Sequence, residues 1–221
     1  MKILTFNLER FKHNEQAILS QIKSFDADII VLTETSGAYQ LNDTYNTVST
    51  KSLPEIFENI KYKVGENRTT IWTRYPILET RKTYDHFTSV CSEIQTEFGI
   101  FNVYGTIIGV FGGIGLRFEA DLQGQINDWD KFDSAKANCI VGDLNVFFSG
   151  YAYPSHKVRN TLYEAFKKLK MQNLTSEIPE NVDHIAISKD FLKGKNTEIE
   201  IFNLDKKLSD HIGICVTIIE E

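Results

Sequence analysis

Short apolar runs that end at polar residues recur along the chain, and this pattern predicts β-strands. Residues 2–8 alternate, with Ile3 and Thr5 on one side and Leu4 and Phe6 on the other. Residues 28–33 are apolar enough for a strand that is covered on both faces. Further strands are predicted at 69–73, 90–96, 100–106, 140–145, 181–187 and 212–219, with weaker candidates at 45–50 and 61–64.

Apolar residues at helical spacing predict helices between these strands. The first begins at about Asn14, which can cap it, and carries Ile18 and Ile22 on one face. The others are predicted at 117–132 and at about 157–169. Strands that alternate with helices are typical of α/β proteins, whose ligands tend to bind at one edge of the sheet.

The segment Ile140-Val141-Gly142-Asp143-Leu144-Asn145 ends an apolar run with a glycine and two polar side chains. In a strand, Asp143 and Asn145 point to the same side, so both can reach one reacting group. Gly142 permits a sharp turn or a close approach of the backbone. An ordinary Asp/Asn turn is the alternative interpretation of this segment alone.

Other predicted strands carry polar residues at matching positions. They are Asn7 and Glu9 after the first strand, Glu34 after the second, Asp183-His184 at the start of a late strand, and Asp210-His211 before the last. The strand–helix–strand unit at residues 1–33 can bring Asn7 and Glu34 to the same sheet edge. Such repetition is hard to attribute to turn chemistry.

Two features near these residues leave alternatives open. Tyr104 is either a core residue or a phenol aimed at a phosphate. The aromatic residues after Asn145, which include Phe147, Phe148 and Tyr151, either stack on a base or sugar or fill the space beneath a long loop.

The glycine-rich segment from Gly105 to Leu116 contains Gly109, Gly112, Gly113 and Gly115. It lacks the lysine and the Ser/Thr of a nucleotide-binding P-loop, so we reject that function. We expect a loop at the rim of the site.

The composition indicates a globular protein, most simply a single domain over residues 1–221. The net charge of −6 gives no general support for tight duplex binding, but it suits a carboxylate site for divalent cations. The cysteines lack metal-ligand spacing, and no signal peptide or membrane span is found. We therefore expect a cytoplasmic protein, and no obligate protein partner is evident.

Taken together, these motifs resemble the endonuclease/exonuclease/phosphatase family, which includes deoxyribonuclease I, exonuclease III and inositol polyphosphate 5-phosphatases. The matching segments, in the family's order, are Thr5-Phe6-Asn7, Leu32-Thr33-Glu34, Gly142-Asp143-Leu144-Asn145, Val182-Asp183-His184-Ile185 and Ser209-Asp210-His211. The resemblance spans nearly the whole chain. It implies an α/β fold, a four-layer α/β sandwich in which two mixed β-sheets pack face to face with helices outside.

The resemblance also implies a role for each matching residue. Glu34 would be the main metal carboxylate, supported by Asn7, Asp210 and Glu9, and the expected metal is Mg²⁺ or Mn²⁺. Asp143 would activate the attacking water. Asn145 and His211 would contact the phosphate, and Asp183 would fix the tautomer of His211. Tyr104 falls where the exonuclease III branch carries a catalytic tyrosine, and Phe147, Phe148 and Tyr151 join Asn145 as substrate-binding candidates.

The function we expect is a divalent-metal-dependent phosphoesterase that hydrolyses nucleic-acid phosphodiester bonds. One alternative is a phosphatase or phosphodiesterase that acts on a small phosphorylated molecule or lipid headgroup. Another is a non-catalytic binding module. The chain departs from the family at Thr33, where glutamine is more usual, and in lacking an obvious basic, aromatic insertion that would grip a duplex.

Overall fold

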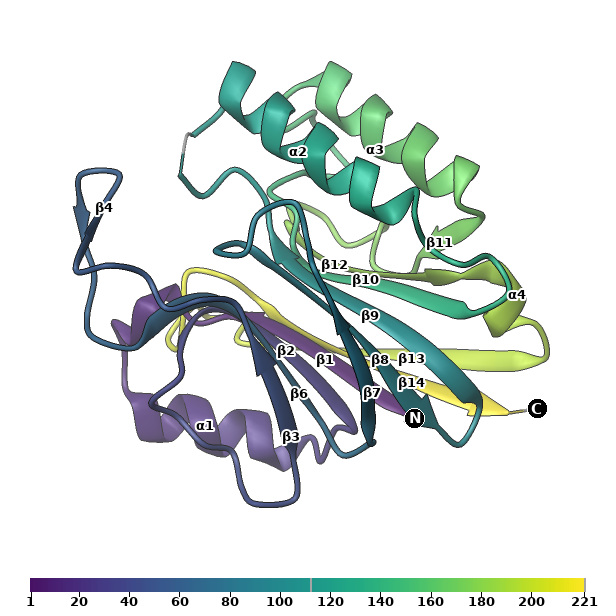
Figure 1. The fold of residues 1–221 in the computed structure, drawn as a ribbon, viewed down its shortest axis with the longest axis horizontal. Coiled ribbons are helices and arrows are strands. Elements are labelled where there is room, and N and C mark those ends of the chain that lie inside the picture. Colours follow the sequence, from purple (N-terminus) through teal and green to yellow (C-terminus); the bar gives the residue numbers. More distant parts are fainter. Residues whose placement is uncertain (112, 221) are drawn as a thin grey trace.

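The computed structural model describes residues 1–111 and 113–220, and it contains two six-stranded sheets (Figure 1). The first sheet holds β13 (Lys195–Phe202), β14 (Gly213–Glu220), β1 (Lys2–Asn7), β2 (Ile29–Ser36), β6 (Glu66–Thr73) and β3 (Asn46–Ser49), in that order. The second holds β11 (Met171–Asn173), β12 (Asp183–Ser188), β10 (Ala137–Asp143), β9 (Gly99–Ile107), β8 (Ser89–Thr96) and β7 (Ile77–Arg81). Gly112, in the predicted rim loop, and Glu221, at the end of the predicted domain, lie outside the described residues.

Each sheet is mixed, because one parallel pair joins antiparallel neighbours. In the first sheet β1 pairs with β2 in parallel, and in the second β9 pairs with β10 in parallel. A short hairpin of β4 (Ile56–Phe57) and β5 (Ile60–Lys61) projects from the body (Figure 1).

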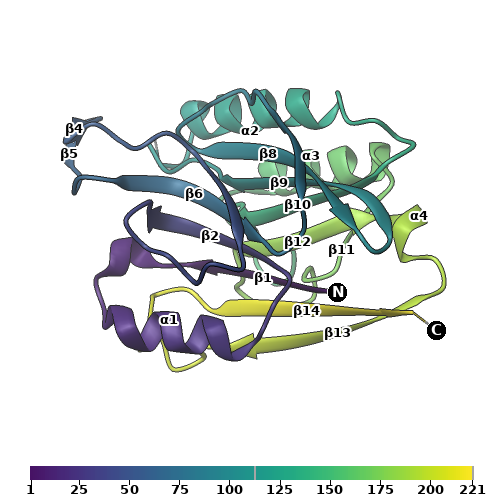
Figure 2. The ribbon, with the colours of Figure 1, turned by 60° about the horizontal axis from the view of Figure 1, so that its bottom comes forward.

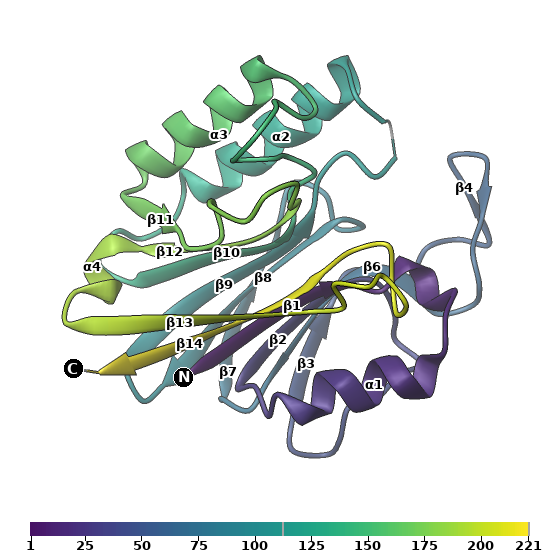
Figure 3. The ribbon, with the colours of Figure 1, turned by 180° about the vertical axis from the view of Figure 1, so that it is seen from behind.

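Helices cover the outer face of each sheet. α1 (Glu15–Ser24) lies on the first sheet (Figure 2). It buries Ile18 and Ile22 there, and Asn14 caps it by accepting a hydrogen bond from the Ala17 N–H. α2 (Leu116–Trp129) and α3 (His156–Lys168) lie side by side on the second sheet (Figure 3). A short helix, α4 (Lys189–Leu192), follows β12. The predicted four-layer sandwich is confirmed.

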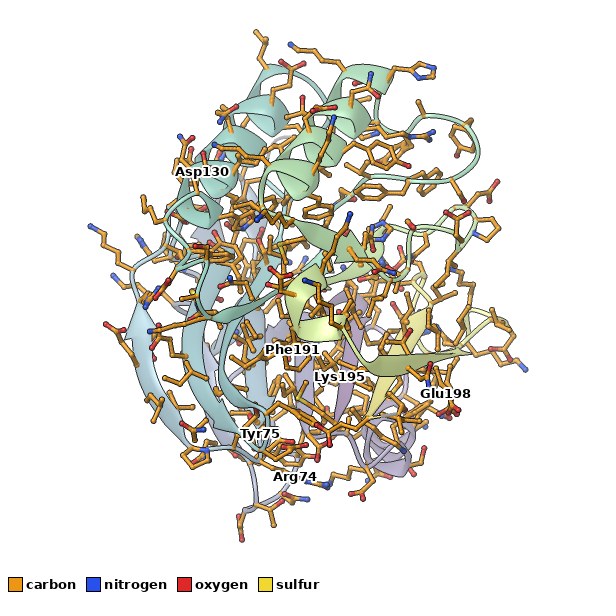
Figure 4. All side chains as sticks on the ribbon, turned by 90° about the vertical axis from the view of Figure 1, so that its right-hand side faces the viewer. Arg74, Tyr75, Asp130, Phe191, Lys195 and Glu198 are labelled. Atoms are coloured by element: carbon orange, nitrogen blue, oxygen red, sulfur yellow. The ribbon has the colours of Figure 1, made fainter. Side chains whose placement is uncertain are left out.

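The two sheets pack face to face through a core that changes character from one end to the other. On the inner side, Ile3, Thr5 and Asn7 follow one another along β1, and Cys139, Val141 and Asp143 follow one another along β10. The apolar end, which faces the viewer in Figure 4, is closed by Tyr75 and Phe191, both partly buried against this core. The opposite end is therefore the place where polar side chains from both sheets meet.

Gly142 lies where β9 and β10 come too close for a side chain. Its φ is +133°, and a Cβ built there would lie 2.1 Å from the carbonyl oxygen of Thr106. This contact explains why a glycine stands directly before Asp143.

Among the described residues, no helix is long and apolar enough to cross a membrane. The cysteines Cys91, Cys139 and Cys215 are all buried and free, as expected for small apolar side chains in a core.

Candidate active site

Six side chains converge at the polar end of the inter-sheet core, and we call them the strand-end cluster: Asn7, Glu34, Asp143, Asn145, Asp183 and His211. Asp143 ends β10 and Asp183 begins β12, and the two residues are paired in register. The ligating atoms of Asp143, Asp183 and His211 all lie within 4.8 Å of one another. The antiparallel pairing of these strands thus creates a carboxylate pair beside one histidine.

His211 is held by Asp183. Its Nδ1 lies 2.6 Å from Asp183 Oδ2, while Asp183 Oδ1 is buried with no hydrogen-bond partner among the described residues. Nδ1 therefore carries the proton in this pair, which leaves Nε2 facing the cavities that border the cluster.

Asp143 is fixed from both sheets. Its Oδ2 accepts a hydrogen bond of 3.1 Å from Asn7 Nδ2, and its Oδ1 accepts one of 3.0 Å from the backbone N–H of Asn145. The side-chain oxygen of Asn7 itself accepts a hydrogen bond of 2.9 Å from the Glu9 N–H. Asn7 thus orients Asp143, and Asn145 is held by a bond of 2.9 Å from its Nδ2 to the Ile108 carbonyl.

The environment shifts the pKa values of Asp143 and His211 upward. Burial raises the pKa of Asp143 to about 7, and the neighbouring Asp183 carboxylate adds to this effect while His211 opposes it. Burial by itself lowers the pKa of His211, but the charge and hydrogen bond of Asp183, with help from Asp143, outweigh it and raise the pKa to about 10. At neutral pH, His211 is therefore charged, and Asp143 is close to the pH at which it takes up a proton.

Glu34 reaches the cluster from the end of β2 with its backbone in the left-handed region, at φ 49°. The pairs Thr33–Thr69 and Thr35–Asn67 flank it, so Arg68 lies opposite on β6. Arg68 Nη1 is 3.6 Å from Glu34 Oε1. Burial raises the pKa of Glu34, and the charge of Arg68 opposes that rise. Sequence reasoning missed Arg68, because a buried arginine within a threonine-rich strand has no motif.

Two cavities flank the cluster. One, of about 230 Å³, is bordered by Glu34 and Asp143 and has an apolar wall that includes Val110, Ile114 and Phe118. The other, of about 250 Å³, is bordered by Asp183, Lys206 and Asp210. Both cavities include Asn145, Tyr153 and His211. The central residues are thus accessible from two sides.

Glu9 and Asp210 lie at the edge of the cluster. Glu9 accepts hydrogen bonds from Lys12 Nζ at 2.6 Å and from the Asp210 N–H at 3.1 Å, and it lies 3.1 Å from His13 Nε2. Asp210 Oδ1 is 3.8 Å from His211 Nε2, and its side chain is 64% exposed. The carboxylate of Glu9 is already neutralised by its neighbours, and it ties the His211 loop to the end of β1.

Tyr104 does not join the cluster, which corrects the prediction that its phenol points at a phosphate. It pairs with Ile140, three residues before Asp143, and both belong to the core beneath α2 and α3. Its hydroxyl lies 3.1 Å from Asp128 Oδ2, and its side chain is buried. Because neighbouring residues alternate across a strand, Tyr104 and Asp143 face opposite sides of the sheet.

The aromatic residues after Asn145 do not all have the same role: one fills the core, and others lie at the cavities. Phe148 is buried and stacks on Phe166 of α3, so the prediction that it binds substrate is corrected. Phe147 borders the second cavity, while Tyr151 is exposed and its ring packs edge to face with that of Phe147. Tyr153, which was not among the predicted substrate-binding residues, borders both cavities.

His184, the neighbour of Asp183, is structural. Its Nε2 donates to the Val146 carbonyl at 2.9 Å, and its Nδ1 lies 2.9 Å from Thr175 Oγ1. Burial lowers its pKa to about 4, so it stays neutral. Of the two Asp-His sequences, each contributes one residue to the central pair: Asp183 from the first and His211 from the second.

A family model matches the sequence, and solved structures match the fold. None of the curated proteins matches the chain. Among solved structures, the endonuclease domain of TRAS1, a telomere-specific non-LTR retrotransposon, superposes with a TM-score of 0.71 at 15% identity, covering 99% of this chain and 97% of that one. An AP endonuclease from Archaeoglobus fulgidus gives 0.69 at 13% identity, with 98% of each chain covered.

A third structure, an endonuclease/exonuclease/phosphatase family protein from Leptotrichia buccalis, gives a TM-score of 0.67 at 15% identity and covers 100% of both chains. These similarities establish the shared fold. The sequence model of the endonuclease/exonuclease/phosphatase family matches residues 4–211, which include every residue of the strand-end cluster. Hydrolysis of phosphoester bonds is the chemistry that the family's members have in common. The chain therefore belongs to the endonuclease/exonuclease/phosphatase family.

Proposed function

We propose that this protein hydrolyses nucleic-acid phosphodiester bonds with the help of a divalent cation, Mg²⁺ or Mn²⁺. The observation that carries the proposal is the convergence of Asp143, Asp183 and His211 within 4.8 Å at the junction of two cavities. A phosphodiester is anionic and resists attack, so its hydrolysis needs a positioned base, a positive donor and charge neutralisation.

Asp143 is the candidate general base. It is buried, fixed by Asn7 and by the Asn145 N–H, and can accept the proton of an attacking water. His211, charged and oriented by Asp183, is the candidate donor to a phosphate oxygen. Asn145 lies beside both and would add a contact to the phosphate.

The residues fit a hard divalent cation. Glu34 is a mostly buried carboxylate at the wall of the first cavity, and burial raises its pKa despite the nearby charge of Arg68, so a further positive charge would stabilise its ionised form. The buried Asp183 Oδ1 is a second oxygen without a partner among the described residues. Asp183 already holds His211 through its other oxygen, so Glu34 is a better candidate than Asp183 for the main cation ligand. Asp210, at the rim of the cluster, is a further candidate. A bound cation would neutralise charge on the phosphate and leaving oxygen.

Three observations favour a diester of nucleic acid over other substrates. A phosphodiester has a substituent on each side of the phosphorus, which suits cavities on both sides of His211 and Asn145. Phe147 and Tyr153 offer aromatic rings, 5.0 Å apart between centroids, on which a base can stack. Two of the similar structures are themselves named as endonucleases.

The net charge of −6 and the small cavities favour a second candidate, a phosphatase or phosphodiesterase for a small phosphorylated molecule or lipid headgroup. A binding module without turnover is the remaining alternative.

Cleavage of end-labelled single- and double-stranded DNA with Mg²⁺ tests these candidates, with p-nitrophenyl phosphate as the monoester. We expect DNA cleavage that a chelator stops and that Asp143→Ala lowers by about 10²–10⁴-fold. Faster turnover of the monoester than of DNA would favour the second candidate. Absence of any Asp143-dependent turnover would favour the binding module.

The pH dependence of kcat/KM follows from the two raised pKa values. Asp143 must be ionised to accept a proton, so activity should fall as the pH drops through about 7, or lower when a cation favours its ionised form. His211 must be protonated to donate, so activity should fall as the pH rises through about 10. A bell-shaped profile with a slightly alkaline maximum is expected. A profile that is flat from pH 6 to 10, with chemistry rate-limiting, would contradict both roles.

A further inference from the structure

Arg68 is a buried cation that the proposed chemistry does not use. Its side chain is 2% exposed, and among the described residues Nε and Nη1 have no hydrogen-bond partner. A buried guanidinium without hydrogen bonds is costly, so a counter-charge must lie nearby. The only carboxylate within ion-pair distance in the described part of the chain is Glu34, at 3.6 Å.

The position of Arg68 is fixed by aromatic rings. Its guanidinium carbon lies 4.7 Å from the ring centroid of Tyr62 and 5.6 Å from that of Phe111. Arg10 lies over the same Tyr62 ring at 4.8 Å, but it hydrogen-bonds Glu66 and the Lys61 carbonyl. Arg10 is thus a neighbour of similar chemistry that is paired with Glu66 and acts on Glu34 only from a distance, whereas Arg68 lies within ion-pair distance of Glu34.

We propose that Arg68 is a built-in counter-cation for Glu34, which weakens cation binding until an anionic substrate is present. This inference rests on the proposed function, because it takes Glu34 as a cation ligand. A fixed positive charge 3.6 Å from a carboxylate oxygen repels any second cation at that carboxylate. An anionic phosphate in the adjoining cavity would supply negative charge in place of the Glu34 charge that Arg68 offsets. Cation and phosphate would therefore bind cooperatively.

The test is Mn²⁺ binding, measured by electron paramagnetic resonance on the 221-residue chain in the absence of turnover. We expect Arg68→Met to bind Mn²⁺ at least about tenfold more tightly than wild type, because the repulsion is removed. Arg68→Lys keeps the charge and should stay within about threefold of wild type. Arg10→Met is the matched control, because Arg10 also lies over Tyr62 but is paired with Glu66, and it should change the affinity by less than about threefold. Arg68→Gln is a second neutral variant, in case the methionine variant does not fold.

Sulfate, a tetrahedral anion that does not precipitate Mn²⁺, tests the cooperativity. It should tighten Mn²⁺ binding to wild type more than to Arg68→Met. Equal or weaker Mn²⁺ affinity in both neutral variants would overturn the inference. Glu34→Gln separates this failure from a failure of the proposed function. If this substitution leaves Mn²⁺ binding unchanged, the cation does not bind at Glu34, and the inference about Arg68 is wrong.

Discussion

Replacing Asp183 by asparagine is expected to lower the turnover number by about 10³–10⁴-fold. Asp183 accepts the Nδ1 proton of His211 at 2.6 Å and is fully buried. An asparagine can turn its amide toward Nδ1 and donate, which would impose the wrong tautomer and remove the charge that keeps His211 protonated. Steady-state kinetics on the best substrate measure this loss.

The pH profile separates this role from simple damage to the fold. Without the Asp183 carboxylate, burial lowers the pKa of His211, so the alkaline limb should move from about 10 toward or below the ordinary value of 6.5. Asp210→Asn is the matched control, because that carboxylate is exposed and 3.8 Å from Nε2. It should cost far less activity and move the limb only slightly, because Asp210 raises the pKa of His211 less than Asp183 does. An Asp183→Asn enzyme with an unmoved alkaline limb would refute the proposed pairing.

Gly142→Ala is expected to lower the free energy of unfolding by about 3 kcal/mol or more. The new Cβ would lie 2.1 Å from the Thr106 carbonyl oxygen, and the φ of +133° is strained for any residue with a side chain. Relief requires β10 to move away from β9, so Asp143 would also lose its position and activity should fall. Urea-induced unfolding, followed by circular dichroism, gives the change in stability.

Gly150→Ala is the control for the backbone alone. Gly150 has a φ of +70°, but a Cβ there meets no atom within 4 Å. Gly150→Ala should lower the free energy of unfolding by only about 1 kcal/mol, because the left-handed conformation is strained for alanine but no atom collides with the new Cβ. If the two substitutions cost the same, close packing at Thr106 is not the reason for the glycine.

Apolar runs that end at polar residues made most of the cluster predictable. Asp143 ends an apolar strand and Asn7 ends β1, and the structure brings them together as alternation predicts. Glu34, near the end of β2, and Asn145, beyond β10, join them through left-handed backbone conformations that alternation does not predict. The roles of these residues remain proposals. Tyr104 was misassigned because alternation gives the spacing along one strand, whereas the side that faces the site depends on the register with β10.

Other features depend on information that the sequence does not express. Phe148 and Tyr153 lie in the same loop, and only its path decides that the first fills the core while the second borders the cavities. The edge strand β13 was missed because most of its residues are exposed and it carries charged side chains, which obscures the apolar pattern. The position of Arg68 opposite Glu34 depends on the register between β2 and β6, which the sequence does not reveal.

The hydrogen bond from Asn7 to Asp143 joins residues 136 positions apart and crosses from one sheet to the other. Neither sheet alone contains the cluster, since Asn7 and Glu34 belong to the first and Asp143 and Asp183 to the second. Contacts of such long range form late and slowly during folding. Activity regained in a refolding experiment would therefore time the docking of the two sheets and not the formation of either one, which makes the chemistry a reporter of the last step of assembly.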